Sequence, residues 1–180
     1  MLSEITQNPL LTGILGAIGG GLITWLIQQI QNKRGSFSYI VTHNQLAYSA
    51  NDIVFGNVTV QWNGRNINNL YLSKIEITNE SMNDYEDVVL STYSSGTELL
   101  TEQTGIIGTP LVLKWSDNYS ELVKVPNGGT PTDSQWSIYK TQREYIVPVI
   151  NRGQVATISY LNEVNDITTR GIWVTATKKV

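Results

Sequence analysis

The first part of the chain carries one long apolar run, from Leu10 to Ile27. No charged residue occurs between Glu4 and Lys33, and the run is interrupted only by two threonines. At about 1.5 Å of rise per helical residue it spans roughly 27 Å, close to the hydrocarbon thickness of a bilayer. The pattern predicts a single transmembrane α-helix that begins at Asn8 and Pro9.

Charges on the two sides of this run predict its orientation. The leader carries Glu4 and no basic side chain, whereas Lys33 and Arg34 directly follow the run. By the positive-inside rule the N-terminus faces outward and the C-terminal domain is cytosolic. The run lacks a basic n-region and a small-x-small cleavage site, so we expect it to stay attached rather than act as a signal peptide. These features predict a single-pass protein of the bacterial inner membrane, with residues 1–34 as the helix and its outside leader.

Small and polar residues recur along this run at three- and four-residue steps, so they share one side of a helix. Small-xxx-small spacing lets helix backbones approach closely in lipid, and lone polar groups prefer a partner or water to lipid. The stripe predicts self-association, as a dimer or as a higher oligomer around a narrow pore. The alternative is that glycine is simply common in membrane helices. The candidate helix-packing or pore-lining residues are Gly13, Gly16, Ala17, Gly20, Gly21, Thr24, Gln28 and Gln31.

From Gly35 onward, apolar and polar residues alternate over short runs, which is typical of half-buried β-strands. Asn63-Gly64 follows one such run and predicts a tight turn. Roughly eight or nine strands without helical periodicity indicate an all-β domain over 35–180, either an antiparallel β-sandwich or a small barrel. The expected strands are 37–42, 54–62, 70–79, 88–93, 111–115, 137–140, 145–150, 154–160 and 172–177.

Four local features refine this expectation. The apolar face of 70–79 changes side near Ser73, which suggests a bulge. Pro148 cannot donate a ladder hydrogen bond, so its strand should be an edge strand or a bulged one. Residues 151–153 (Asn-Arg-Gly) should form a short hairpin between the strands on either side. The longest irregular section is 116–135, which is either a connector or a binding loop.

The chain has a poor inventory of catalytic groups. It contains no cysteine, which excludes thiol nucleophiles, disulfides and Cys-ligated zinc and suits a cytosolic domain. His43 is the only histidine, and no GxGxxG, Walker A or GxSxG motif is present. We therefore expect no enzyme, no cofactor and no metal. An acidic patch without EF-hand spacing is more typical of a solvated loop than of a calcium site; it comprises Glu80, Asp84, Glu86 and Asp87.

The charge balance narrows the possible partners. The net charge is −3, the isoelectric point is about 5.1, and no basic stripe is visible, which argues against nucleic acid. Several arginines fall in or beside expected turns, where their guanidinium groups could converge on a small anionic ligand such as a phosphate. The alternative is a set of scattered surface arginines. The residues concerned are Arg65, Arg143, Arg152 and Arg170.

The predicted architecture resembles that of the single-pass membrane effectors of bacterial antiphage defence. The stretches on which the likeness of the β domain rests are 58–79 (VTVQWNGRNINNLYLSKIEITN) and 145–162 (YIVPVINRGQVATISYLN). The order of the elements in this domain is similar to that of a β-sandwich found in uncharacterised bacterial proteins. The resemblance implies a cytosolic sensing or oligomerising domain coupled to helices that breach the inner membrane and stop growth.

Three functional hypotheses follow. The first is a homo-oligomerising effector that perturbs or permeabilises the inner membrane in antiphage (abortive-infection) defence, with the lipid bilayer as its partner. The second is a membrane-tethered β-sandwich binding module that recruits a cytosolic protein. The third, a membrane-tethered enzyme, is the least favoured because of the poor catalytic inventory. The glycine stripe favours the first hypothesis over the second, since a plain anchor has no use for close helix packing.

Overall fold

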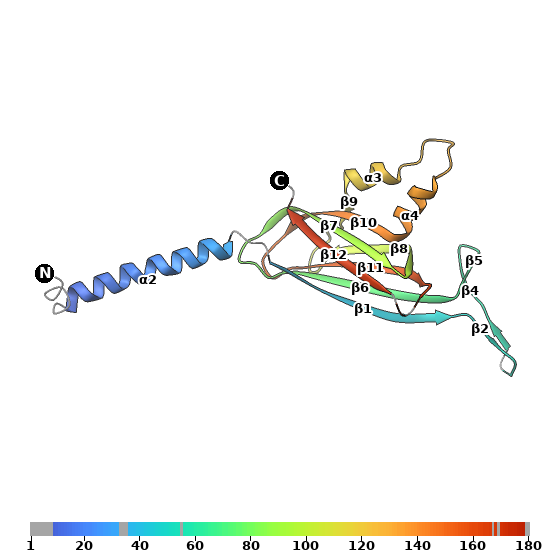
Figure 1. Cartoon of the computed structure of the whole chain (residues 1–180), viewed down its shortest axis with the longest axis horizontal. Helices are drawn as coiled ribbons and strands as arrows, with labels where there is room; N and C mark the ends of the chain where they lie inside the picture. The colour runs from blue at the N-terminus through green and yellow to red at the C-terminus, as the bar shows by residue number, and fades with distance from the viewer. Residues whose placement is uncertain (1–8, 33–35, 55, 167, 169, 179–180) are drawn as a thin grey trace.

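The computed structural model describes residues 9–32, 36–54, 56–166, 168 and 170–178, and most of the chain after residue 36 forms antiparallel strands (Figure 1). The helices are α2 (Pro9–Asn32), α3 (Asp117–Val123) and α4 (Asp133–Thr141). The strands are β1 (Phe37–Tyr48), β2 (Ala50–Asp52), β3 (Gly56–Val58), β4 (Val60–Trp62), β5 (Arg65–Ile67), β6 (Asn69–Asn79), β7 (Tyr85–Ser95), β8 (Thr97–Ile106), β9 (Lys114–Trp115), β10 (Gln142–Ile150), β11 (Val155–Val164) and β12 (Gly171–Lys178).

Two four-stranded sheets pack face to face around one core. The first sheet has the order β1-β6-β11-β8, and the second has the order β12-β7-β10-β9. Because both sheets contribute to one buried cluster, the domain has the layered arrangement of an antiparallel β-sandwich. The cluster includes Ile75, Ile77, Leu99, Ile106, Ala156, Ile158 and Tyr160 from the first sheet and Val88, Leu90, Tyr145, Val147, Ile150 and Ile172 from the second.

Polar groups within this core are also paired across the two sheets. The Tyr160 hydroxyl lies 3.0 Å from the hydroxyl of Tyr145 and 2.7 Å from that of Thr92. Tyr160 belongs to the first sheet, and both of its partners belong to the second. Since a buried hydroxyl without a partner costs about 1–3 kcal/mol, these hydrogen bonds help to fix how the sheets face each other.

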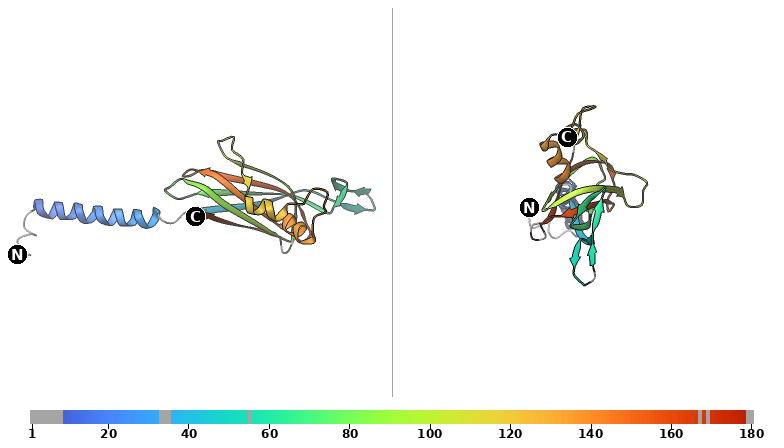
Figure 2. Two further views of the ribbon diagram at one scale, coloured as in Figure 1. Left: turned by 90° about the horizontal axis from the view of Figure 1, so that it is seen from above. Right: turned by 90° about the vertical axis from the view of Figure 1, so that its right-hand side faces the viewer.

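Away from the sandwich, α2 runs along the long axis of the molecule, and the hairpin of β2 and β3 projects at the opposite end (Figures 1 and 2). The helices α3 and α4 lie together beside β9 and β10. They are consecutive along the chain and both precede β10, which places them at one edge of the second sheet. The hairpins β2–β3 and β4–β5 both lie at the end of the sandwich remote from α2 (Figure 1).

The prediction of a transmembrane helix is wrong for the described residues. The helix α2 forms, but no described helix is long and apolar enough to cross a membrane. The apolar residues of α2 are interrupted by five glycines, by Thr24 and by Gln28. The leader with Glu4 and Asn8, the Lys33-Arg34 pair and the boundary at Gly35 lie outside the described residues.

Strand β6 confirms the predicted strand over 70–79, and the inward residues alternate regularly with more exposed ones along it. The bulge expected near Ser73 is wrong, because the alternation is unbroken there. The irregularity in this sheet lies instead on β1, between Gln45 and Ala47, where the register against β6 shifts. The apparent change of face arose from Leu70 and Leu72, which are half-buried on the outer side of β6.

Two predicted segments have a different secondary structure. The expected strand at 137–140 is the second half of α4, and the section at 116–135 contains α3 and the start of α4. The start of α4 is a capping box, in which Thr132 and Gln135 satisfy each other's free backbone N–H groups. Strand β8 has no counterpart among the expected strands, because its Thr, Glu and Gly residues leave little apolar alternation.

The turn predictions are partly confirmed. Asn63 (φ 49°) and Gly64 (φ 80°) form the tight turn between β4 and β5. Pro148 lies on the free edge of β10 beyond the short strand β9, as expected for a residue without an N–H. The segment 151–153 is not a hairpin between paired strands, since β10 and β11 belong to different sheets. It carries the chain across the core instead.

Truncation of a core residue tests this packing. Ile158→Ala removes a fully buried side chain from β11 and should lower the free energy of unfolding by about 2–5 kcal/mol in urea denaturation. Ile40→Ala is the matched control, because Ile40 on β1 is 63% exposed and should cost less than about 1 kcal/mol. Equal losses in the two variants would contradict the assignment of the core.

Candidate functional site

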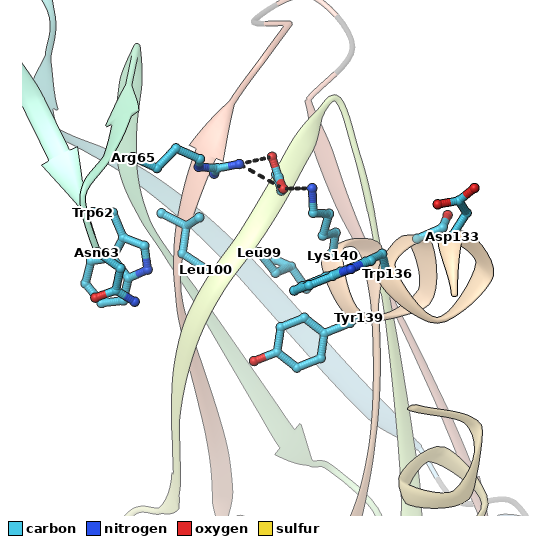
Figure 3. Close-up of a pocket in the computed structure, with 11 residues that line it drawn as sticks. Trp62, Asn63, Arg65, Leu99, Leu100, Asp133, Trp136, Tyr139 and Lys140 are labelled. Carbon is cyan, nitrogen blue, oxygen red and sulfur yellow. Dashed lines mark hydrogen bonds and ion pairs between the residues drawn. The ribbon is translucent and has the colours of Figure 1, made fainter. Parts of the chain in front are cut away.

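A groove of about 720 Å³ lies between α4 and the β4–β5 hairpin. We call it the two-tryptophan groove, because Trp62 and Trp136 lie on its two sides (Figure 3). Leu99 and Leu100 of β8 lie between them. A volume of this size is typical of small-molecule sites, which combine apolar walls with a few placed polar groups.

The hairpin wall of the groove is anchored through Ile67, which is fully buried at the end of β5. Ser49 reinforces this wall, because its hydroxyl donates to the carbonyl of Ile67 at 2.6 Å and accepts from the N–H of Val60 at 3.0 Å. These bonds join both strands of the hairpin to the end of β1. Trp62 therefore projects from a hairpin whose base is fixed to the sandwich.

Charged residues line the upper part of the groove (Figure 3). The Glu98 carboxylate forms ion pairs with Arg65 Nη1 at 3.1 Å and with Lys140 Nζ at 2.5 Å. Arg65 Nη2 forms a further ion pair with Glu163 at 2.9 Å. Burial alone would raise the pKa of Glu98, but the bonds from Lys140 and Arg65 outweigh it and lower that pKa. Glu98 is therefore ionised at neutral pH and holds two cations in fixed positions.

The α4 wall rests on a buried arginine, Arg143, whose side chain is 1% exposed. Its guanidinium donates to Glu102, to the Tyr119 hydroxyl and to the carbonyl of Tyr139. The ring of Tyr139 lies 4.4 Å from the guanidinium carbon, within cation–π distance, and Tyr139 also lines the groove. Arg143 thus links the α4 wall to strands β8 and β10.

The same cluster changes the acid–base properties of its members. Burial raises the pKa of Tyr119 to about 12. Burial alone would lower the pKa of Arg143, but the carboxylate of Glu102 and the neighbouring tyrosines outweigh it and raise that pKa. Trp115 adds a hydrogen bond from its indole N–H to Glu102 and an edge contact to the Tyr119 ring. The cluster is a hydrogen-bonded support behind the groove.

The four arginines proposed as anion contacts do not converge. Arg65 lies in the groove, and Arg143 is buried behind it. The Arg170 guanidinium lies 5.0 Å from the centre of the Tyr71 ring. Arg152 lies in the connection between β10 and β11, where its backbone N–H donates to the Asp84 carboxylate. Only Arg65 is placed where a ligand in the groove could reach it.

The residues of the predicted helix stripe lie on α2, and those whose side chains are described are exposed. No other group lies within 4 Å of a Cβ built on Gly13, Gly16, Gly20 or Gly21. The Thr24 hydroxyl donates to the carbonyl of Gly20 at 2.8 Å, so it is satisfied within its own helix. The side chain of Gln31 lies outside the described residues. Self-association through this stripe stays a prediction.

His43 belongs to a polar chain inside the first sheet. Its Nδ1 lies 2.7 Å from the Ser73 hydroxyl, which lies 2.9 Å from the side-chain amide of Asn162. Burial lowers the pKa of His43, and the positive charge of Arg170 lowers it further. Ser73 is fully buried, so it is not placed to attack a substrate. Within the described part of the chain, no three metal-ligating side chains gather at one point.

Sequence reasoning missed the residues that make the groove. Trp62 lay at the end of the expected strand 54–62, Trp136 fell just outside the expected strand 137–140, and Glu98 lies on a strand that was not expected. One available signal was the pair of Trp62 and the Asn63-Gly64 turn, since an aromatic residue beside a turn projects at the end of a hairpin. Another was the Thr132-x-x-Gln135 capping box, which marks the helix that carries Trp136.

Removal of one partner of the buried ion pair should destabilise the protein strongly. Glu102→Gln leaves the Arg143 guanidinium buried without its carboxylate, and we expect a loss of about 3 kcal/mol in the free energy of unfolding. Glu121→Gln is the control, because the pair of Glu121 with Lys124 is exposed and should contribute less than about 1 kcal/mol. A Glu102→Gln loss no larger than the control would contradict the supporting role.

The lowered pKa of His43 predicts that the free energy of unfolding changes between pH 7.5 and 5.5. Its pKa is lower in the folded state than the ordinary value of about 6.5, so the unfolded chain takes up the proton first. The free energy of unfolding should therefore fall as the pH drops below about 6.5. His43→Gln should flatten this part of the profile in urea denaturation, because the chain has no other histidine. An unchanged slope would contradict a half-buried imidazole that stays neutral in the folded state.

Comparison with known proteins assigns no family to this chain. No protein-family model matches the sequence, and no curated protein matches it. What the protein does must therefore be inferred from the geometry and chemistry of the two-tryptophan groove.

Proposed function

We propose that this protein is a non-catalytic binding module, whose β-sandwich carries the two-tryptophan groove at the end remote from α2 (Figure 1). The observation that carries this proposal is the pair of tryptophans on the two sides of a groove whose upper part holds a bonded charge network. The function lies in recognition, because the groove residues offer contact surface and hydrogen bonds rather than an activated nucleophile.

The exposure of Trp136 supports this proposal. Its side chain is 46% exposed, although a large apolar ring on a surface helix could have packed against α3 or the sheet. It is held there by an edge contact to Tyr139 at 6.1 Å and by Lys140, whose Nζ lies 5.7 Å from the ring centre. An apolar ring that is fixed in place but left open is suited to contact a ligand.

The hypothesis of a pore-forming effector required a helix that spans a bilayer. No helix among the described residues is long and apolar enough to do so. The homo-oligomer, the protein partner, the place in the bacterial inner membrane and the part in antiphage defence stay predictions. The small anionic ligand is not favoured within the groove, because Arg65 and Lys140 already pair with Glu98.

Ligand-observed NMR on the full chain tests the proposal with three probe classes: neutral trisaccharides, ATP and a proline-rich decapeptide. At least one class should show saturation transfer from the protein. Trp62→Ala and Trp136→Ala should each weaken that binding at least about fivefold, because loss of an aromatic stacking contact costs about 1–3 kcal/mol.

Trp173→Ala is the matched control, because Trp173 is 50% exposed on β12 and does not line the groove. It should leave the affinity within about twofold of the parent. The proposal fails if no probe class binds, or if binding is the same in the two groove variants as in the parent.

A further inference from the structure

We infer that the ligand of the two-tryptophan groove is a neutral oligosaccharide of at least two sugar rings. This inference rests on the proposed function and specifies the chemical class of the ligand. It follows from three properties of the groove: its balance of charge, its mixture of hydrogen-bond donors and acceptors, and the placement of its two indole rings.

The charge balance disfavours an ionic ligand. The groove and its immediate partners carry two cations, Arg65 and Lys140, and three carboxylates, Glu98, Glu163 and Asp133. A phosphate or carboxylate ligand would have to displace Glu98 from its cations and would be repelled by Asp133 at the rim. A cationic ligand would meet the two fixed positive charges. In either case desolvation of the ligand charge is poorly compensated, which leaves a neutral ligand as the best match.

The mixture of donors and acceptors fits hydroxyl groups. Lys140 and Arg65 present N–H donors on the same side of the groove where the carboxylate of Glu98 presents acceptor lone pairs. A phosphate oxygen only accepts, and an ammonium group only donates. A hydroxyl does both, so a pair of neighbouring hydroxyls on one sugar ring can bond to the carboxylate and to a cation together. Bonds to charged groups are also the stronger ones.

The tryptophans supply the apolar part of the contact. One face of a sugar ring is formed mainly by C–H groups, and a flat indole covers such a face without leaving a polar group unpaired. Trp62 comes from the hairpin and Trp136 from α4, with the leucines of β8 between them (Figure 3). Two separate indole platforms on the two sides of one groove suit two rings of a longer chain better than a single ring.

Isothermal titration calorimetry on the full chain tests the inference with ligands that differ in charge. The neutral probes are triacetylchitotriose, cellotriose and maltotriose, and the charged ones are the glucosamine trimer, trigalacturonate and inorganic pyrophosphate. We expect at least one neutral trimer to bind at least tenfold more tightly than every charged probe, and to lose at least about fivefold in affinity in both Trp62→Ala and Trp136→Ala.

Glu98→Gln provides a second test that does not depend on the tryptophans. This change removes the carboxylate shared by Lys140 and Arg65 Nη1 and leaves Arg65 Nη2 paired with Glu163, so pyrophosphate should bind the variant more tightly than the parent, while the neutral trimer should bind it at least threefold more weakly. Trp173→Ala again serves as the control and should leave all affinities within about twofold.

The outcomes separate this inference from the proposed function. Tighter binding of a charged probe than of any neutral trimer, with dependence on Trp62 and Trp136, would overturn the inferred neutral oligosaccharide and keep the binding module. Binding of a neutral trimer that is unaffected by either tryptophan variant would overturn both. Absence of binding by all six probes would also overturn the oligosaccharide as the ligand.

Discussion

The arrangement of the domain beyond its two sheets depends on the buried charge of Arg143. A guanidinium that is removed from water must be paired and hydrogen-bonded, or its burial costs several kcal/mol. Here the pairing group comes from β8, the hydroxyl partner from α3 and a carbonyl partner from the end of α4. Three segments that are separate in the sequence are therefore held at one point, and the position of α4 beside the sheet follows from that requirement.

The two walls of the groove are fixed by different means. On the α4 side, the Tyr139 ring packs against the Arg143 guanidinium and makes an edge contact with Trp136. The buried arginine therefore supports Trp136 through the ring of Tyr139. On the hairpin side, the support is a buried Ile67 and the hydrogen bonds of Ser49. Between the walls, Glu98 joins the hairpin to α4 through Arg65 and Lys140. Because all of these contacts are made between residues of the protein itself, the groove is largely preformed.

The sequence was informative where a long strand has one buried and one open face. The strands at 70–79, 145–150 and 154–160 were predictable, because their alternation directly reflects burial. Four residues at 137–140 could not separate a strand from a helical turn, and β8 has too few large apolar residues to show a period. The apolar run at the N-terminus indicated a helix, but its length in residues did not establish that the helix crosses a membrane.

The groove was beyond prediction for a different reason. Trp62, Glu98, Trp136 and Lys140 come from three segments that meet only when the sandwich has formed, so no local spacing reveals them. The arginines illustrate the converse. All four were chosen for their place beside turns, but a turn fixes only the local backbone, and the fold sends these residues to different parts of the domain.

One feature of the topology bears on how the chain reaches this state. From β6 to β12, each strand passes to the opposite sheet, except for β9 and β10, which share a sheet and are separated by α3 and α4. The shortest of these crossings is a single residue, Gly96, with φ 65°. Apart from β9 with β10, no pair of consecutive strands in this region can therefore form an isolated hairpin, and both sheets must be assembled from distant segments. In chains with such remote pairings, the entropy of loop closure is lost before the stabilising contacts form. Folding on the slow side of the millisecond-to-second range is the natural consequence.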